Sequence, residues 1–258
     1  MDLGLTGRNA LVMGSTKGMG FGIARRLAAE GANVAVCGRK QEDAAAAAES
    51  IGASAKGYAL DLSDAGSVAA LIAAIEADMG DVDIVVCNGG GPPPGDIADV
   101  APELWTKQFE IMFVNQLRIV NAFLPGMRSR GWGRIVAVSS SGIQQPIPGL
   151  GISNALRSAQ VGWAKTLASE VAKDGVTVNI VAPGRIHTER VDQIDNANAE
   201  RQGKPVDDVV KASLAQIPAG RYGSVEEFAD TAVFLCSANA GYVTGGVIRV
   251  DGGYIRGV

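Results

Sequence analysis

The chain has 258 residues, of which 47% are hydrophobic and 19% are charged, and its formal net charge at pH 7 is −4. This composition is typical of a folded globular protein, and the length allows one or two domains. The acidic balance argues against a surface that binds nucleic acid, and the apolar stretches are too short to cross a bilayer. We therefore expect no nucleic-acid partner and no membrane partner.

Cysteine and histidine usage narrows the class of protein further. The cysteines Cys37, Cys87 and Cys236 are far apart and form no CxxC motif, as expected for a reduced, cytoplasmic protein. The first residues, MDLGLTGRN, do not show a basic region followed by an apolar run, so we expect no signal peptide. Because the chain has one histidine, we predict no metal site.

Seven short runs of apolar and β-branched residues predict strands, at 9–13, 33–37, 55–59, 84–87, 134–138, 177–181 and 247–250. Helical patterns lie between them, at 21–30, 41–51, 63–79, 102–130, 152–173 and 225–236. Apolar strands that alternate with amphipathic helices indicate parallel strands covered on both faces. We therefore predict an α/β protein with a single-domain Rossmann fold over residues 1–258, built on a doubly wound, seven-stranded parallel sheet.

One polar segment interrupts this alternation. Residues 188–220 lie between the sixth predicted strand and the last predicted helix, and they carry charges of both signs. A long insertion at this position is either a substrate lid or a surface excursion, and lids are drawn from such segments. We interpret residues 188–220 as a substrate lid.

A glycine-rich turn follows the first predicted strand and leads into the first predicted helix. Glycines with the spacing Gly-x-x-x-Gly-x-Gly permit a tight turn whose backbone N–H groups approach a pyrophosphate, and the helix N-terminus adds a favourable dipole. The alternative is a simple strand-to-helix turn, because such turns are common. The position between a strand and a helix favours a dinucleotide site. The residues expected to contact the cofactor here are Gly14, Ser15, Thr16, Lys17, Gly18, Met19 and Gly20.

The end of the second predicted strand favours NADP(H) over NAD(H). An NAD site usually places an acidic residue here, whereas Arg39 suits the 2′-phosphate of NADP. Lys17 is a second cation that could reach the same phosphate, although Arg39 could also be an ordinary solvated arginine. After the third strand, Asp61 and Leu62 are expected to contact the adenine, with the alternative that Asp61 caps a helix.

The order of the motifs along nearly the whole chain resembles the short-chain dehydrogenase/reductase family, most closely its 3-oxoacyl-acyl-carrier-protein reductase-like branch. Beyond the glycine turn, the resemblance rests on segments that stand in the family's order, namely Asn88-Gly89 after the fourth strand, Asn115, Ser139-Ser140 after the fifth strand, Pro183-Gly184 with Thr188, and the closing VDGG at 250–253. It implies that Asn88, Gly89, Pro183, Gly184, Ile186 and Thr188 bind the cofactor. It also implies a homotetramer or homodimer.

The sequence departs from the family at the catalytic pair. The family uses Tyr-x-x-x-Lys on one helix face, with the tyrosine thirteen positions after the serine. Counting from Ser140 reaches Ser153, and four positions further stands Arg157. A serine hydroxyl is a poor general acid. Arg157 keeps a positive charge that could hold the cofactor ribose or an oxyanion, but it does not donate a proton at ordinary pH.

Two sources could supply the proton in place of the missing tyrosine. His187 follows the Pro-Gly turn and titrates in the useful range, although it could also be a plain loop histidine. Alternatively, a water held by Ser140, Ser153 and Asn115 could relay a proton. The candidate catalytic residues are therefore Asn115, Ser140, Ser153, Arg157 and His187.

These residues support three hypotheses about function. The first is an NADP(H)-dependent oxidoreductase with an atypical catalytic set, acting on the carbonyl or alcohol group of a small-molecule substrate. The second is a catalytically silent NADP(H)-binding sensor or scaffold. The third is a non-redox lyase or isomerase that reuses the cleft, since a fold does not fix a function. We favour the first.

Overall fold

The computed structural model describes residues 2–257. Within this range, seven strands form one parallel sheet with the order β3-β2-β1-β4-β5-β6-β7. The strands are β1 (Asn9–Val12), β2 (Asn33–Gly38), β3 (Ala55–Ala59), β4 (Ile84–Cys87), β5 (Gly133–Val138), β6 (Val176–Pro183) and β7 (Val247–Val250). The predicted Rossmann-type sheet is confirmed, and each strand lies within two residues of its predicted bounds.

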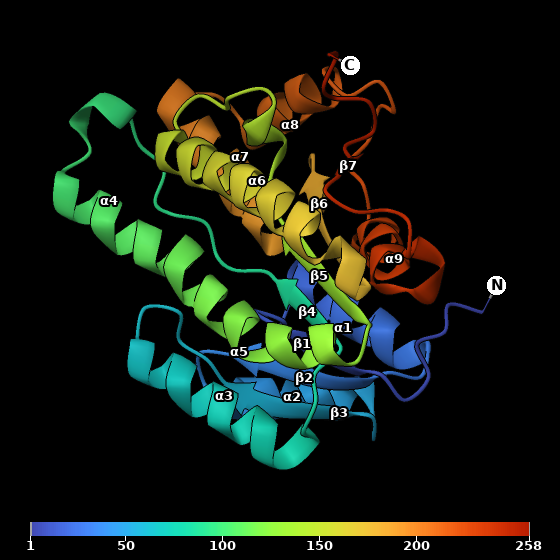
Figure 1. Cartoon of the computed structure of the whole chain (residues 1–258). Coiled ribbons are helices and arrows are strands. Elements are labelled where there is room, and N and C mark those ends of the chain that lie inside the picture. The colour runs from blue at the N-terminus through green and yellow to red at the C-terminus, as the bar shows by residue number, and fades with distance from the viewer. Residues whose placement is uncertain (1, 258) are drawn as a thin grey trace.

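The α-helices of the described range cover both faces of the sheet (Figure 1). They are α1 (Gly18–Ala29), α2 (Gln41–Ile51), α3 (Ala65–Met79), α4 (Pro102–Phe109), α5 (Asn115–Ser129), α6 (Gly151–Val171), α7 (Glu189–Gln202), α8 (Val206–Leu214) and α9 (Val225–Cys236). One apolar cluster joins the sheet to α3, α5 and α6, and a second joins it to α1, α2 and α9. The alternation of side chains along each strand supplies both clusters.

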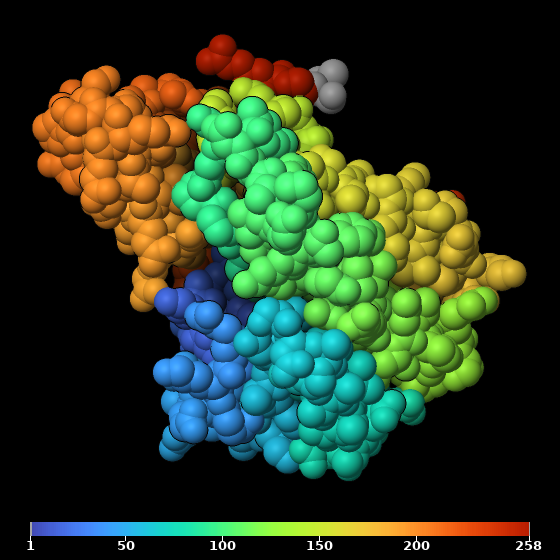
Figure 2. All heavy atoms as spheres, turned by 90° about the vertical axis from the view of Figure 1, so that its left-hand side faces the viewer, coloured from blue at the N-terminus to red at the C-terminus, as the bar shows by residue number. Residues whose placement is uncertain are grey.

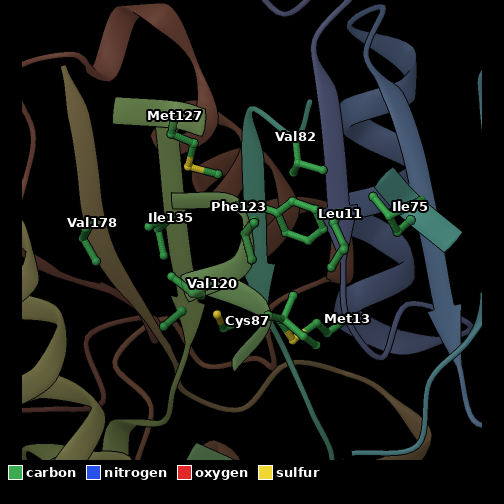
Figure 3. Packing of buried hydrophobic residues seen from close by; sticks show 14 of the residues in the cluster. Leu11, Met13, Ile75, Val82, Cys87, Val120, Phe123, Met127, Ile135 and Val178 are labelled. Atoms are coloured by element: carbon green, nitrogen blue, oxygen red, sulfur yellow. The ribbon is translucent and has the colours of Figure 1, made fainter. Parts of the chain in front are cut away.

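The first apolar cluster lies between the sheet and α3 and α5 (Figure 3). Leu11 and Met13 from the first strand region point to this face, together with Ile75 of α3 and Phe123 of α5. All four side chains are buried, which removes a large apolar area from water and stabilises the fold. The free thiols Cys37, Cys87 and Cys236 are buried too, and burial raises the pKa of each to about 12, so they stay protonated.

Two predicted segments differ from the structure. The single helix predicted at 102–130 is divided into α4 and α5 by a π-helical turn, Glu110–Val114. The predicted helix at 63–79 begins at Ala65, because the side chain of Asp64 accepts a hydrogen bond from the backbone N–H of Gly66 (2.8 Å) and caps the helix there. The chain stays helical from α4 through the π-turn into α5, so the sequence pattern predicts one continuous helix.

Residues 188–220, interpreted from sequence as a lid, contain two helices, α7 and α8, which follow β6. Their predicted polar character is retained, since most of their residues are exposed. No helix within residues 2–257 has both the length and the hydropathy needed to cross a bilayer. In the same range, no group of three acidic, histidine or cysteine side chains is arranged to hold a metal ion.

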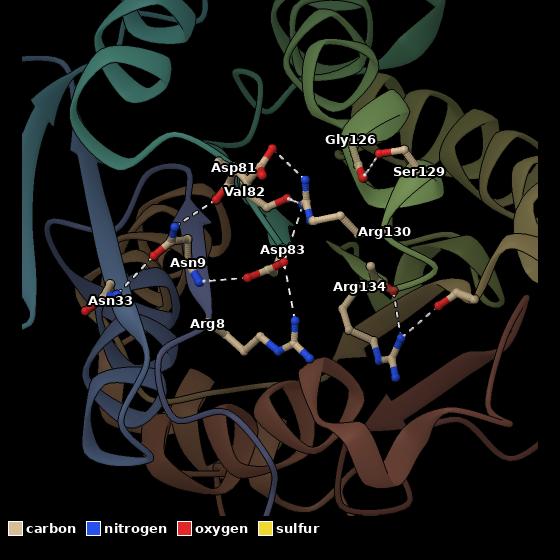
Figure 4. A network of polar contacts seen from close by, with 12 residues as sticks. Arg8, Asn9, Asn33, Asp81, Val82, Asp83, Gly126, Ser129, Arg130 and Arg134 are labelled. Atoms are coloured by element: carbon tan, nitrogen blue, oxygen red, sulfur yellow. Dashed lines mark hydrogen bonds and ion pairs between the residues drawn. The ribbon is translucent and has the colours of Figure 1, made fainter.

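A polar network joins several elements at the amino ends of β1 and β4 (Figure 4). Asp83, directly before β4, accepts a hydrogen bond from the backbone N–H of Asn9 (3.2 Å). Its other oxygen lies 3.5 Å from Nη1 of Arg8 and 3.4 Å from Nη2 of Arg130, which follows α5. This network therefore links β1, β4 and α5 at the end of the sheet opposite to the glycine turn.

Candidate active site

The glycine turn between β1 and α1 has the backbone geometry of an anion-binding turn. Gly14 and Gly18 have φ angles of 56° and 58°, a conformation that favours glycine. A Cβ at Gly20 would lie 2.4 Å from the carbonyl oxygen of Gly14 and 2.5 Å from Nδ2 of Asn88, so this position also requires glycine. The turn leads directly into the N-terminus of α1, an arrangement that suits a phosphate group.

The turn lies at the switch point of the sheet, where ligands of open α/β sheets bind. β1 is paired with β2 on one side and with β4 on the other. Asn88, directly after β4, donates from Nδ2 to the carbonyls of Met13 (3.1 Å) and Gly14 (2.9 Å). A Cβ at Gly14 would lie 3.6 Å from Cα of Gly89. The structure therefore brings the predicted cofactor residues Asn88 and Gly89 against the glycine turn.

Three side chains of the turn serve the fold. The buried Oγ of Ser15 donates to the last carbonyl of β1 (2.6 Å) and accepts from the backbone N–H of Cys37 (2.9 Å). A Cβ added at Gly38 would lie only 2.3 Å from the methyl group of Thr16, so Thr16 packs directly on β2. Met19 packs against the apolar cluster that includes α1. The backbone N–H of Ser15 also donates to the carbonyl of Cys37 (2.8 Å), so both its N–H and its hydroxyl tie the turn to β2 and β1.

Arg39 lies just beyond the end of β2, exposed to solvent. No carboxylate of the described chain lies within 4.0 Å of its guanidinium. Hydrogen bonds from the N–H (2.8 Å) and hydroxyl (2.7 Å) of Ser63 lower the pKa of Asp61, and the charge of Arg39 lowers it further. Asp61 and Arg39 therefore lie close together, while the N-cap of α3 is Asp64.

Lys17, the other predicted partner of the 2′-phosphate, has a protein partner in this structure. Its Nζ lies 2.5 Å from Oε2 of Glu189, the first residue of α7. Thr188 lies against the turn as well, because a Cβ added at Gly18 would be 3.7 Å from the methyl group of Thr188. The segment after β6 therefore reaches the glycine turn, and it brings the predicted cofactor residue Thr188 with it.

The predicted residues between β6 and α7 have different surroundings. Pro183 ends β6, and a Cβ at Gly184 would lie 2.7 Å from Cα of Asp251, so this position requires glycine. Ile186 is buried in the apolar cluster, so its side chain serves the core. Of these residues, the structure gives Ile186 a packing role that the sequence resemblance did not imply.

Asn115 begins α5 directly after the π-turn and is 2% exposed. Its Nδ2 donates to the carbonyl oxygen of Leu62 (2.8 Å), and its Oδ1 accepts from Nη1 of Arg118 (2.8 Å). Both polar atoms of the side chain therefore have protein partners. Asn115 links the loop after β3 to α5, which holds the predicted cofactor residue Leu62 in place.

Ser140, Ser153 and Arg157 are gathered around the end of β5. Ser140 caps a short 3₁₀ turn through its Oγ, which accepts from the backbone N–H of Gly142 (3.1 Å). Ser153 lies in the first turn of α6 and is 8% exposed. One turn later on the same helix face, Nη1 of Arg157 donates to the carbonyl of Val138, the last residue of β5 (2.8 Å).

Arg157 carries a positive charge near the end of β5. Burial, and then the nearby charge of Arg190, lowers the pKa of Arg157 to about 10. The guanidinium is therefore still protonated at neutral pH. Its one hydrogen bond in the described chain is the bond to the carbonyl of Val138.

His187 does not lie where a proton donor to the substrate would be expected. Its side chain is 72% exposed, and Nε2 lies 3.7 Å from Oδ1 of Asp192 on α7. Its backbone N–H donates to the carbonyl of Gly223 (2.9 Å). Within the described chain, no hydrogen bond joins its ring to Ser140 or Ser153, so the geometry gives no direct support to His187 as the proton donor.

The sequence interpretation missed the residues that anchor α7. Asp195, 2% exposed, accepts from Nη1 of Arg185 (2.6 Å) and from the hydroxyl of Tyr222 (2.8 Å). These residues are ten and twenty-seven positions away from Asp195, so no local pattern reveals the contacts. Also missed was Arg190, whose Nη2 lies 3.5 Å from the carbonyl oxygen of Pro92 in the loop after β4.

Figure 2 shows a hollow on one side of the molecule. The orange lobe formed by α7 and α8 stands on one side of this hollow, and the green segment that follows β4 stands on the other. Dark-blue atoms of the N-terminal part of the chain lie at its floor. The cleft therefore has a nucleotide end at the glycine turn and a second end bordered by β5, α6 and α7.

Comparisons with known proteins match the whole architecture. A protein-family model described as enoyl-(acyl carrier protein) reductase matches residues 14–255. The chain is 34% identical over 247 residues to the 3-oxoacyl-(acyl-carrier-protein) reductase FabG of Escherichia coli (strain K12), covering 96% of this chain and 97% of that protein. It is 36% identical over 264 residues to the D-beta-hydroxybutyrate dehydrogenase of Cupriavidus necator, covering 97% and 99%.

A solved structure gives a similar match along the full length. The L-sorbose reductase from Gluconobacter frateurii, complexed with NADPH and L-sorbose, superimposes with a TM-score of 0.93 at 32% sequence identity. The match covers 100% of each chain. The similarity therefore includes the α7–α8 segment as well as the sheet.

Proposed function

The chain belongs to the short-chain dehydrogenase/reductase family, and we propose that it is an NADP(H)-dependent oxidoreductase with an atypical catalytic set, acting on a carbonyl or alcohol group. The observation that supports this proposal most is the close packing of Gly20 against Gly14, which makes the glycine turn an anion cradle. Arg39 at the end of β2 adds a free cation where a 2′-phosphate is expected. The NADPH complex of the similar sorbose reductase supports the same choice of cofactor.

The residues present fit this cofactor. The backbone of the turn from Gly14 to Gly20 would hold the diphosphate, Arg39 the 2′-phosphate, and Thr188 the nicotinamide half. When bound, the reduced nicotinamide supplies a hydride to a substrate carbon. The remaining contacts, from Asp61, Asn88 and the backbone of neighbouring residues, position it.

Side chains of the protein bind the substrate oxygen and stabilise its charge. Ser140 and Ser153 hold this oxygen by hydrogen bonds, and the positive charge of Arg157 stabilises the negative charge that develops on it during reduction. The oxygen must also gain a proton to become an alcohol. Arg157 keeps its proton at neutral pH and a serine hydroxyl is a weak acid, so a water held by the two serines relays a proton from bulk solvent to the oxygen and is itself reprotonated by the solvent.

The α7–α8 segment is the substrate lid in this proposal. It carries mostly exposed residues, and its first turn contacts the glycine turn through Glu189 and Lys17. Asp195 and Tyr222 anchor its base by a hydrogen bond of 2.8 Å. A segment that is tied at its base and otherwise held by an exposed ion pair and by the long contact of Arg190 with Pro92 can open for ligand exchange.

We also propose a cytoplasmic homodimer or homotetramer that pairs through α4, α5 and α6. The rings of Phe109 and Phe113 are stacked with centroids 5.1 Å apart, and Trp163 meets Phe113 edge-on at 6.4 Å. Phe109 is 41% exposed, so this aromatic surface supports contact with a second copy. Light scattering on the purified protein measures the mass, and a monomer at all concentrations would contradict the proposal.

A catalytically silent NADP(H)-binding sensor or scaffold is the second candidate function. The observation that favours it is the buried serine at position 153, where the family resemblance implies a tyrosine. None of the chain's tyrosines lies on α6, and Tyr222 is engaged with Asp195. This candidate predicts tight NADPH binding without turnover.

The direct test is turnover of NADPH by the purified protein. We expect the nicotinamide absorbance to fall in the presence of a panel of ketones, oxo acids and oxoacyl thioesters, with a clear preference among them. Binding of NADPH is measured in parallel by its fluorescence. Binding without turnover of any compound would favour the sensor or scaffold, whereas turnover without a change in absorbance would indicate a lyase or isomerase.

A further inference from the structure

Asn154, in the first turn of α6, binds the loop after β5 through both polar atoms of its side chain. Its Nδ2 donates to the carbonyl of Ile147 (3.0 Å), and its Oδ1 accepts from the N–H of the same residue (3.3 Å). Ile147 stands between two prolines, which have no N–H, so it carries the single backbone donor of residues 146–148. The side chain of Asn154 therefore ties this part of the loop to α6.

The same side chain also packs against the short 3₁₀ turn Ser141–Ile143, which begins the loop. Gly142 is buried in this turn, and a Cβ added there would lie 2.4 Å from Oδ1 of Asn154. Oδ1 is held in place by the N–H of Ile147, so it does not move aside without losing that hydrogen bond. Asn154 therefore fixes the position of Gly142 as well as that of Ile147.

Gly142 in turn sets the hydrogen bonding of Ser140. The N–H of Gly142 donates to Oγ of Ser140 (3.1 Å) and occupies one lone pair of this oxygen. Within residues 2–257, the O–H of Ser140 donates to no protein acceptor, and the residue is partly exposed. The proton of this hydroxyl is therefore available to a ligand, and the direction in which it points depends on where Gly142 lies.

We propose that Asn154 is a positioning residue for the reaction: it holds residues 141–147 so that the hydroxyl of Ser140 points at the substrate oxygen. This inference rests on the proposed oxidoreductase function, in which Ser140 binds that oxygen. Asn154 itself touches neither substrate nor cofactor in this proposal. It acts through Gly142, whose N–H bonds to Oγ of Ser140.

The placement of Ser140 is especially important in this chain. Position 153 has a serine and no phenol, so the donors to the substrate oxygen are two short hydroxyl side chains. A hydrogen bond that stabilises charge in the transition state depends steeply on geometry, and a shift of about 1 Å slows a reaction by about tenfold to 100-fold. Loss of the two bonds between Asn154 and Ile147 should therefore reduce the rate of the chemical step through Ser140.

The first experiment is a double-mutant cycle, measured with the compound that the unmodified protein reduces fastest. Asn154→Ala should lower kcat by about tenfold, while the dissociation constant of NADPH stays within about twofold. In the Ser140→Ala background, the same change should lower kcat by less than about twofold, because no hydroxyl remains to be positioned. Asn239→Ala is the control and should leave kcat unchanged, since it removes a comparable bond, from Nδ2 to the carbonyl of Asp2 (2.8 Å), at the N-terminal segment.

The second experiment follows backbone amide exchange by mass spectrometry and needs no turnover. Amides of residues 142–147 should exchange about tenfold faster in Asn154→Ala, because the loop has lost its tie to α6, whereas Asn239→Ala leaves their exchange unchanged. Asn154→Asp serves in both experiments if Asn154→Ala does not fold. It keeps the size of the side chain and the acceptor for the N–H of Ile147 but loses the donor, so we expect changes of about threefold to fivefold.

The outcomes separate this inference from the proposed function. A loss of kcat that disappears in the Ser140→Ala background, together with faster exchange at residues 142–147, supports the role of Asn154. An equal loss of kcat in both backgrounds, an unchanged kcat, or unchanged exchange overturns this role and leaves the oxidoreductase intact. Absence of turnover in the unmodified protein contradicts the oxidoreductase. In that case faster exchange still supports Asn154 as the residue that holds the loop beside Ser140, and unchanged exchange overturns it.

Discussion

The Nζ atom of Lys17 lies 2.5 Å from Oε2 of Glu189, and this ion pair joins the glycine turn to the first turn of α7. The side chains are 73% and 71% exposed, so the pair adds little to the stability of the fold. Its position matters more, because Lys17 is also a predicted ligand of the 2′-phosphate. We therefore predict that Glu189 and the phosphate compete for the ammonium group of Lys17.

Replacing Glu189 by Gln should tighten the binding of NADPH by about threefold, because it frees Lys17 and removes a negative charge near the phosphate. Lys17→Met should weaken NADPH binding by a similar factor, while the affinity for NADH changes little in either variant. Fluorescence titration with both cofactors measures these effects. Weaker NADPH binding in Glu189→Gln would mean that the ion pair organises the site instead of competing for it.

Arg39→Ser should reduce cofactor discrimination. Loss of a charge-assisted hydrogen bond to the 2′-phosphate raises the dissociation constant of NADPH by about tenfold or more and leaves that of NADH nearly unchanged. Lys40→Ser, the neighbouring exposed cation, is the control for a general electrostatic effect. Equal losses in the two variants would show that Arg39 does not contact the phosphate directly.

Gly20→Ala should disrupt the cradle. A Cβ at this position would lie 2.4 Å from the carbonyl oxygen of Gly14, so we expect the free energy of unfolding to fall by about 2 kcal/mol and NADPH binding to be lost. Gly162→Ala on α6 is the matched control, because a Cβ there meets no heavy atom within 4 Å. It should stabilise the helix by ~0.5–1 kcal/mol. Urea denaturation measures both, and an unaffected Gly20→Ala would refute the packing argument.

Restoring the family's pair by Ser153→Tyr with Arg157→Lys should raise the activity on ketones. The tyrosine supplies a general acid, which raises kcat on ketones by about 100-fold. Ser153→Phe with Arg157→Lys has nearly the same bulk and no phenol, so it should not gain this activity. A folded, NADPH-binding Tyr variant with no gain on ketones would contradict the assigned role of position 153.

The fold was predictable because its signals are local. Continuous apolar runs such as residues 84–87 and 134–138 predict buried parallel strands, and each lies in the sheet as expected. The helices α7 and α8 were not predicted, since α7 is strongly polar and the apolar stripe of α8 spans only nine residues. They are held by contacts such as that of Asp195 with Tyr222, which are distant in the sequence and arise only in the folded chain.

The candidate site was predictable to a similar extent. The glycine turn follows from local rules, because its positive φ angles and the close approach at Gly20 require glycine. The partners of its side chains do not, because Lys17 and Glu189 are 172 residues apart. His187 illustrates the same limit, since its ring lies next to Asp192 rather than beside the catalytic serines. Motifs locate a site, whereas the charges around it depend on tertiary contacts.

The network around Asp83 has a mechanical consequence for the cleft. Asp83 binds the start of β1 through the N–H of Asn9 and also holds Arg8 and Arg130, all at the edge opposite to the glycine turn. The network therefore links the two halves of the sheet at the amino ends of β1 and β4. We therefore expect exchange of cofactor and substrate to depend on movement of the α7–α8 segment.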